Sequence, residues 1–478
     1  MKVAFGKIKI TPKHYLGIPL AGYTPIPKCT GVLDDLYAHG VLIEDEELGN
    51  IKRRVLLISL DLLKLSLSFT NYIKEKIQKK YPISPGQVLI HATHTHKGPD
   101  VTGEFDRPGG FAQIVFNIIN GHHKNDLYLV WVAGQIVKLV GELLQKLRPC
   151  KIAWAREPPV YSHLASNRRH AGQKPPDVGV IAFRSLEDDH LIGFIMHFAA
   201  HGITLGRHTT KISADWIGFA VRRVTDLTRG EVQAAYFNGP SGDVSPGVPH
   251  WLVAPPTKPF ASKEERRVYY RHIMGYRRTE GIGNAVGEQA LRLAQSIPLE
   301  EYLPKMSLRI YVKTIWIPVK DFKYWSKHWF ENSPLQFLKR YLLIPIAMTH
   351  ETPNFPGFAL KRRGCMLNTY TLIQWILIKA SSLDNTKSKD LSILTAPGEL
   401  FEEIGWRLRS KCPTGVANTF IFQNSHDWVS YLFPKQLYIT SGGYEPYASL
   451  SPMCGHVYEQ EMRKLFQEVT AGVNLYFS

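Results

Sequence analysis

The chain alternates short apolar runs with longer stretches in which apolar residues recur every three or four positions. Residues 3–10, 40–45 and 54–60 are rich in Val, Ile and Leu and are separated by short turn signals, which is typical of strands. Residues 66–80, "SLSFTNYIKEKIQKK", begin with a serine, keep helical apolar spacing and end in lysines, so they predict an exposed helix. The strand "QVLIHAT" at 87–93 follows.

The same alternation continues through the middle of the chain. Residues 126–147 carry a second helical pattern, which Pro149 ends, and residues 215–229 carry a third. Strands are expected at 151–155, 178–184, 191–198 and 232–239. We therefore expect an α/β protein, with mixed β-sheets flanked by helices, that forms one large domain over residues 1–478.

The segment 247–365 departs from this pattern and predicts a divergent insertion within the domain. Its part 321–348 interleaves aromatic residues with Lys and Arg, and Phe322, Trp325 and Trp329 share one helical face. An amphipathic element at a membrane surface has this composition. A segment that packs on the body of the protein or covers a substrate pocket has it too, so both interpretations stay open.

Charge and cysteine content narrow the class of protein. The net charge of +17 favours an anionic partner, but the basic residues are scattered and no nucleic-acid module is recognisable. The five cysteines are far apart and form no CxxC pair, which argues against a cysteine zinc site or a disulfide framework. Neither a signal peptide nor a membrane span is evident. We expect a cytoplasmic protein, with peripheral contact to an anionic membrane as an option.

Three histidines lie close together in "VLIHATHTHKGPD", residues 88–100. On a regular strand His94 and His96 point to the same side and His91 points away. A His-x-His pair at a strand end can bring two imidazoles to one metal ion. A catalytic zinc usually takes three protein ligands and leaves one position for water. The motif therefore predicts half of a metal site.

Later stretches supply candidates for the other half. "IMHFAAHGITL" ends a strand with His197 and His201, and "TAPGELFEE" places Glu399 at an expected helix start, either as a ligand or as a helix-end charge. "FQNSHDWVSYLF" adds His426, Asp427 and Tyr431. "YFNGPSGDVSP" is a polar turn with Ser245, but it lacks the Gly-x-Ser-x-Gly spacing of a serine hydrolase.

Taken together, these stretches resemble the neutral/alkaline ceramidases, zinc-dependent amidases that remove the fatty acyl chain from the sphingosine nitrogen. The resemblance covers about residues 3–450 except 247–365. Its motifs run in the family's order: "GKIKITP", "ATHTHKGP", "SNRRH", "HFAAHGITL" followed by "ISADWIGFA", "NGPSGDVSP", "APGEL", and "VSYLFP" followed by "GGYEPYAS".

The resemblance implies a role for each matching residue. The zinc ligands would be His94, His201, Glu399 and Tyr431. His96 matches the general base beside the metal, and Arg168 and Tyr444 match the pair that holds the carbonyl oxygen and the developing oxyanion. Ser245 matches a serine near the site. By the same resemblance, His91 and His197 have no metal role.

This chemistry is coherent on its own terms, because zinc lowers the pKa of a bound water to about 7 and so supplies the nucleophile that amide hydrolysis needs. The chain also departs from the family. Lys97 stands where a small residue is common, and 34 residues follow Tyr444, too few for the immunoglobulin-like domain that known ceramidases usually add. These departures predict a catalytic domain without that second domain, and substrate recognition of its own.

Several alternatives stay open. The same scaffold could hydrolyse a different N-acyl amine or run the reaction in reverse as an acyltransferase. A metallo-β-lactamase or amidohydrolase fold also uses His-x-His, but Lys97-Gly98 replaces the Asp-His continuation of the first, and the eightfold repeat of the second is not evident. A non-enzymatic, basic membrane-binding protein is the third alternative.

Overall fold

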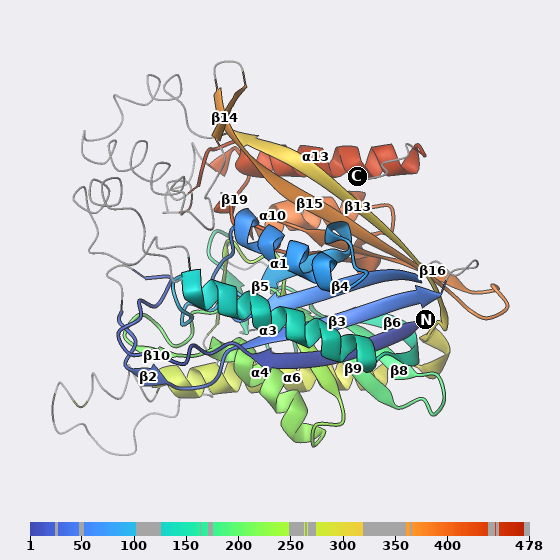
Figure 1. The fold of residues 1–478 in the computed structure, drawn as a ribbon, viewed down its shortest axis with the longest axis horizontal. Helices are drawn as coiled ribbons and strands as arrows, with labels where there is room; N and C mark the ends of the chain where they lie inside the picture. Colours follow the sequence, from blue (N-terminus) through green and yellow to red (C-terminus); the bar gives the residue numbers. More distant parts are fainter. Residues whose placement is uncertain are drawn as a thin grey trace.

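The computed structural model describes residues 1–23, 27–46, 52–101, 126–162, 164–170, 175–247, 274–318, 360–363, 366–437 and 449–472, together with Ser262, Glu265 and Glu445. These residues build two large β-sheets that face each other, with helices on the outer sides of both, and three two-stranded sheets (Figure 1). The mixed sheets flanked by helices that the sequence predicts are confirmed.

The larger sheet has eight strands in the order β11-β9-β8-β6-β1-β3-β4-β5. Neighbouring strands are antiparallel except for the parallel pairs β4/β5 and β9/β11. In chain order the strands are β1 (Lys2–Lys9), β3 (Tyr37–Glu46), β4 (Lys52–Leu60), β5 (Val88–Ala92), β6 (Arg148–Glu157), β8 (Val178–Ser185), β9 (Leu191–Phe198) and β11 (Gln233–Asn238).

This sheet curls until its two edge strands approach each other. The backbone N–H of Asn238, at the end of β11, donates to Nε2 of His91 on β5 at 3.0 Å. The hydroxyl of Ser59 on β4 donates to the carbonyl of Tyr236 on β11 at 2.6 Å. The chain segments that follow β5 and β9 are brought to one region in this way, although many strands separate them in the sheet order.

The smaller sheet covers the concave side of the larger one. Its strands β13 (Lys305–Pro318), β15 (Met366–Ser381), β16 (Ser388–Thr395) and β18 (Thr419–Phe422) lie in that order, and β14 (Leu360–Arg363) pairs with β15. One buried cluster joins the two sheets, with the rings of Phe237 and Phe422 stacked at 4.5 Å between centroids.

Helices cover the outer faces because alternate side chains of each strand point outward. On β4, Val55 and Leu57 face the second sheet, whereas Leu56 and Ile58 face the helices. Helices α1 (Leu67–Lys80) and α3 (Asp126–Gln145) cover one half of the large sheet, and α4 (Asp215–Leu227) and α6 (Met274–Ser296) cover the other. Helices α10 (Glu402–Lys411) and α13 (Cys454–Thr470) cover the small sheet (Figure 1).

Helix α3 is long and apolar. By length and hydropathy, Leu127–Gln145 is the one helix among the described residues that could cross a membrane. One of its sides, with Val132, Ile136 and Leu143, packs into the core beneath the large sheet. Core helices pass the same test of length and composition, so this observation does not place the protein in a membrane.

Part of the segment 247–365, predicted as a divergent insertion, belongs to the framework. Helix α6 packs Ile282, Val286 and Ala290 into the core with α4, and β13 pairs with β15 along its whole length. The predicted insertion can therefore comprise only those parts of 247–365 that lie outside these framework elements. The aromatic and basic stretch 321–348 lies outside the described residues.

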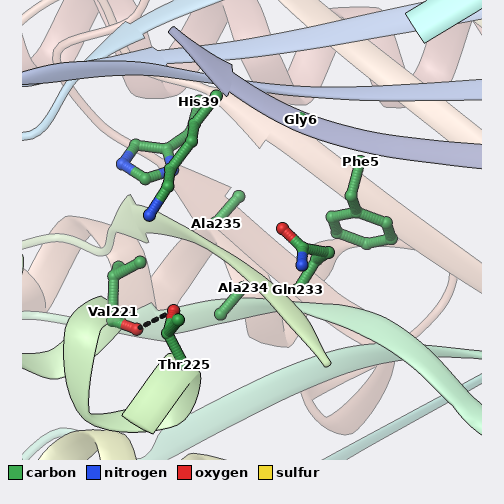
Figure 2. Close-up of a pocket in the computed structure, with 9 residues that line it drawn as sticks. Phe5, Gly6, His39, Val221, Thr225, Gln233, Ala234 and Ala235 are labelled. Atoms are coloured by element: carbon green, nitrogen blue, oxygen red, sulfur yellow. Dashed lines mark hydrogen bonds between the residues drawn. The ribbon is translucent and has the colours of Figure 1, made fainter. Parts of the chain in front are cut away.

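A small pocket lies between β1, β3, β11 and α4, away from the residues predicted to act (Figure 2). Its histidine, His39, stays neutral because burial, with some help from Lys7, lowers its pKa to about 3. Thr225 at its rim donates within α4 to the carbonyl of Val221 at 3.3 Å. The pocket therefore offers no charged acid–base pair, and none of its lining residues belongs to the candidate site.

Candidate metal centre

His94 and His96 lie in the turn that follows β5. The predicted strand at 87–93 is confirmed as β5, but strand alternation does not orient the two rings, because β5 ends at Ala92 and His94 adopts a left-handed backbone with φ of 69°. Thr95 then forms a parallel bridge with Gly202, and the His96 N–H donates to the Gly202 carbonyl at 2.9 Å. This turn, rather than strand alternation, brings the two imidazoles to one point.

His201 lies just after the end of β9. Its carbonyl accepts the indole N–H of Trp216 from α4 at 2.9 Å, which fixes the chain after the strand. At the next residue, Gly202, a Cβ atom would lie 2.8 Å from the carbonyl oxygen of His94. Only glycine fits at this junction, and it lets the turns after β5 and β9 touch.

Glu399 lies shortly after the end of β16, a strand of the smaller sheet. It lies on the two-residue strand β17 (Glu399–Leu400), which pairs in parallel with β19 (Tyr431–Leu432), so that Glu399 is opposite Tyr431. The prediction that Glu399 starts a helix is wrong, because α10 begins at Glu402 after this strand. The site thus forms where the ends of both sheets meet.

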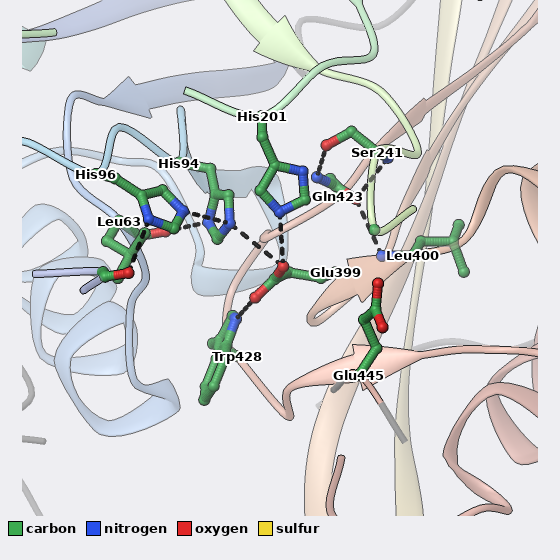
Figure 3. Close-up of polar contacts among 12 residues, drawn as sticks. Leu63, His94, His96, His201, Ser241, Glu399, Leu400, Gln423, Trp428 and Glu445 are labelled. Carbon is green, nitrogen blue, oxygen red and sulfur yellow. Dashed lines mark hydrogen bonds and ion pairs between the residues drawn. The ribbon is translucent and has the colours of Figure 1, made fainter. Parts of the chain in front are cut away.

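Four side chains converge there with their polar atoms toward one another (Figure 3). Oε2 of Glu399 lies 3.1 Å from Nε2 of His201 and 3.4 Å from Nε2 of His94. Nε2 of His96 lies 3.4 Å from Nε2 of His94. One ring nitrogen from each of the three histidines falls within 4.8 Å of the others. Among the described residues, these histidines form the one cluster with metal-ligand spacing.

The tautomers of the three rings follow from their other nitrogens. Each Nδ1 faces a backbone carbonyl, that of Leu63 for His94 at 2.7 Å, of Gly22 for His96 at 3.1 Å, and of Val244 for His201 at 3.0 Å. A carbonyl oxygen can only accept, so each Nδ1 carries the hydrogen. All three Nε2 atoms therefore present lone pairs to the centre, which is the usual arrangement of metal-binding histidines.

The electrostatics of the cluster agree with this assignment. Burial, strengthened by the neighbouring rings, lowers the pKa of His96 well below its usual value, and burial also lowers the pKa of His201. Burial alone would raise the pKa of Glu399, but His94 and His201 outweigh it and hold that pKa well below the usual range. The site thus holds Glu399 as a buried carboxylate next to the imidazole rings of His94 and His201.

This donor set fits a metal ion. With Nδ1–H of each ring directed at a carbonyl, the Glu399 carboxylate faces two imidazole nitrogens, and a cation bound between them would compensate its buried charge. Neutral imidazoles and a carboxylate are the ligands of catalytic zinc sites. His94, His201 and Glu399 would hold such an ion, with His96 beside it. Other divalent first-row metals bind the same donors, so the donor set does not identify the metal.

Gly22 is predicted to be essential to this geometry. Its φ is 103°, and a Cβ atom there would lie 2.3 Å from Nδ1 of His96. In Gly22→Ala the His96 ring must move and lose its hydrogen bond, and a misplacement of about 1 Å can cost about 10²-fold in rate. We expect kcat to fall by about that factor, with metal content preserved. Gly17→Ala is the matched control, because Gly17 has a φ of 79° but nothing within 4 Å. Equal rates for the two variants would contradict the assignment.

Arg168 lies beside the cluster, and its guanidinium donates hydrogen bonds to three acceptors. It follows β7 (Ala165–Asn167), which pairs with β12 (Val244–Pro246). Its guanidinium donates to the Gly242 carbonyl at 2.6 Å, to Oγ of Ser245 at 3.0 Å and to Oε1 of Glu445 at 3.1 Å. Glu445 also pairs with Arg169. In this geometry Ser245 orients Arg168, and Arg168 in turn lies close enough to His201 to lower the pKa of that ring.

The remaining residues singled out in the sequence fall in three places. Tyr431 is buried beside Glu399, its ring 6.4 Å from that of Phe401 between centroids. Tyr444 lies outside the described residues. His91 and His197 are buried in the core between the sheets, where His91 bonds to Ser59 and Asn238, and Nε2 of His197 donates to the carbonyl of Ile421.

Sequence reasoning missed several residues that shape the site. Trp428 donates to Glu399, and Glu445 bonds to Arg168. Both lie inside stretches that the sequence had singled out, within three residues of Tyr431 and Tyr444. Proximity to a candidate residue was thus a usable signal. The carbonyls of Leu63, Gly22 and Val244 have no such signal, because every residue carries a carbonyl.

Comparisons with known proteins identify a family and a similar fold. A sequence model described as neutral/alkaline non-lysosomal ceramidase, N-terminal, matches residues 2–253. The fold is similar to that of the neutral ceramidase from Pseudomonas aeruginosa, with a TM-score of 0.72 and 18% identity, over 100% of this chain and 75% of that one. A ceramidase complexed with C2 gives a TM-score of 0.71 and 16% identity, over 100% of this chain and 76% of that one. Curated protein sequences give no match.

Proposed function

Because the chain belongs to the neutral/alkaline non-lysosomal ceramidase family, a family of amide hydrolases, we propose that it is a zinc-dependent amidase. Its substrate would be ceramide or a related N-acyl lipid, and its products a fatty acid and a free amine. One observation carries the proposal: Nε2 of His94 and Nε2 of His201 both face the buried carboxylate of Glu399, and Nε2 of His96 lies next to them.

His94, His201 and Glu399 would hold the zinc ion, and Tyr431, opposite Glu399 on β19, is the further ligand that the resemblance implies. The ion would supply Lewis acidity, polarising the amide carbonyl and lowering the pKa of a bound water to about 7. Oε2 of Glu399 reaches His94 and His201, whereas Nε2 of His96 approaches His94 instead. We therefore assign His96 to proton transfer rather than to metal binding.

His96 is suited to move a proton. Its Nδ1–H is fixed on the Gly22 carbonyl, so Nε2 is free to accept the proton of the attacking water as a general base. When the C–N bond breaks, the same nitrogen would return that proton to the leaving amine.

Arg168 would stabilise the negative charge that develops on the carbonyl oxygen. Hydrogen bonds to Gly242, Ser245 and Glu445 hold its guanidinium in place before the reaction. Preorganised donors of this kind are often the largest single contribution to catalysis, and the loss of one costs about 10²–10³ in rate. Tyr444 is assigned to the same oxyanion by resemblance alone.

Product analysis tests the proposal. Purified, zinc-loaded protein is incubated with ceramides of several acyl lengths, N-acyl ethanolamines and N-acyl amino acids, and fatty acid and free amine are measured by mass spectrometry. We expect equal amounts of both products from at least one N-acyl lipid, with loss of activity on chelation and recovery with zinc. Release of no fatty acid from any member of the set would contradict the proposal.

The same assay separates the alternatives that stay open. Incubation of fatty acid with sphingosine measures the reverse acylation, and the N-acyl series identifies the amine headgroup. Liposomes that contain an anionic lipid test the peripheral membrane contact that the net charge of +17 predicts. A cytoplasmic location stays a prediction from the sequence.

A further inference from the structure

Glu399 divides its two carboxylate oxygens between different partners (Figure 3). Oε2 faces His94 and His201, and Oε1 accepts the indole N–H of Trp428 at 3.0 Å. Because Oε1 is directed at the indole N–H, a rotation that brings both oxygens to one ion would weaken that bond. Trp428 therefore selects binding through a single oxygen.

A buried lysine lies over the face of the Trp428 indole ring. Nζ of Lys64 is 3.8 Å from the centroid of the Trp428 ring, and Lys64 is only 2% exposed. A cation over an indole face is attracted by the ring quadrupole, more strongly where water is excluded. It also draws electron density from the ring, which makes the N–H a stronger donor toward Glu399.

The position of Lys64 in the chain links it to the site a second time. The preceding residue, Leu63, offers the carbonyl that accepts Nδ1–H of His94 at 2.7 Å. Two consecutive residues after β4 thus act on two candidate ligands, Leu63 on His94 directly and Lys64 on Glu399 through Trp428. A shift of this short segment would move both ligands together.

The backbone of Trp428 is fixed as well. Oδ1 of Asp427 accepts the backbone N–H of Trp428 at 2.9 Å and that of Leu67, at the start of α1, at 3.0 Å. Ser430, two residues further on, has a φ of 68°, and its carbonyl accepts the Glu399 N–H at 3.0 Å. The indole is therefore held from its backbone side and from its ring face.

We infer that Lys64 and Trp428 are positioning residues that hold Glu399 as a single-oxygen ligand and strengthen metal binding. This inference rests on the proposed metal site. Partners that hydrogen-bond to metal ligands typically contribute 10–100-fold in metal affinity when mutated. Trp428 belongs to that class, and Lys64 acts one step further from the ion.

The test measures zinc affinity by competition with a chromophoric chelator, without any substrate. Trp428→Phe keeps an aromatic ring under Lys64 but removes the N–H, and we expect a 10–100-fold weaker zinc affinity. Lys64→Met is expected to weaken zinc binding by a smaller factor, which Lys64→Arg restores. Circular dichroism checks that each variant is folded, and the two lysine variants test the inference even if Trp428→Phe does not fold.

The chain contains a matched control for both substitutions. Nε1 of Trp154 donates to Oδ1 of Asn418 at 2.8 Å, and Nζ of Lys389 lies 4.9 Å above the Trp154 ring. Neither residue belongs to the candidate metal site. Trp154→Phe and Lys389→Met are therefore expected to leave zinc affinity unchanged, although each removes the same chemical groups.

The outcomes separate this inference from the proposed function. Wild-type zinc affinity in both Trp428→Phe and Lys64→Met overturns the inference, as does an equal loss in Trp154→Phe. If the variants bind zinc more weakly but the wild type hydrolyses no N-acyl lipid, the inference holds and the proposed reaction fails. If the wild type binds no zinc at all, both fail.

Discussion

Replacement of Glu399 by alanine is expected to remove zinc from the protein and to abolish amide hydrolysis. Oε2 of Glu399 is the one negatively charged atom in contact with His94 and His201 among the described residues, so its loss leaves two neutral imidazoles. The drop in zinc affinity should exceed the 10–100-fold that is typical when only a hydrogen-bond partner of a ligand is lost. Metal content after dialysis and the rate of fatty acid release measure the two effects.

The control for this variant is Glu403→Ala. Glu403 lies four residues away in α10 and pairs with Arg407, so its loss removes the same charge without touching the histidines. We expect this control to keep zinc and activity. A Glu399→Ala protein that retains about one zinc per chain, or full activity without it, would rule out Glu399 as a ligand.

Replacement of His96 by glutamine is expected to leave zinc in place while kcat falls by about 10²–10⁴, the usual contribution of a general acid–base residue. Glutamine keeps a polar side chain of similar reach but cannot accept and return a proton at pH 7. Metal content and kcat are measured on the same preparations. His190→Gln is the control, because His190 is an exposed histidine that pairs with Asp188 away from the cluster.

The pair of measurements on His96 also separates its two conceivable roles. Loss of rate with zinc retained identifies proton transfer. Loss of zinc together with rate would show that His96 is a ligand, since its Nε2 is within 3.4 Å of Nε2 of His94. In that case the general base must be sought elsewhere in the site.

The positions of most strands and helices were predictable from the sequence, because strands and helices that pack on both sides carry apolar residues in recognisable patterns. Residues 54–60 and 191–198 are mostly apolar, as expected for strands covered on both sides, and they lie in β4 and β9. Ser66 was predicted to cap a helix, and its side chain accepts the Phe69 N–H at the start of α1. Local patterns of this kind are readable because each depends on a few neighbouring residues.

The proximity of three candidate residues was predictable, but their geometry was not. The resemblance pointed to His94, His201 and Glu399, which do meet. The left-handed turn at His94 and the short strand at Glu399 could not be predicted, because both depend on pairing with remote chain segments. The carbonyl partners of the three histidines lie 31, 74 and 43 residues away in sequence, and backbone atoms leave no mark in a sequence.

The central claim is that His94, His201 and Glu399 hold a catalytic metal ion. Anomalous diffraction from crystals of the purified protein, recorded on both sides of the zinc absorption edge, tests it most directly when paired with elemental analysis of the same sample. We predict about one zinc per chain and a single strong anomalous peak in contact with Nε2 of His94, Nε2 of His201 and Oε2 of Glu399. A protein that hydrolyses N-acyl lipids with no metal at that position would contradict the account.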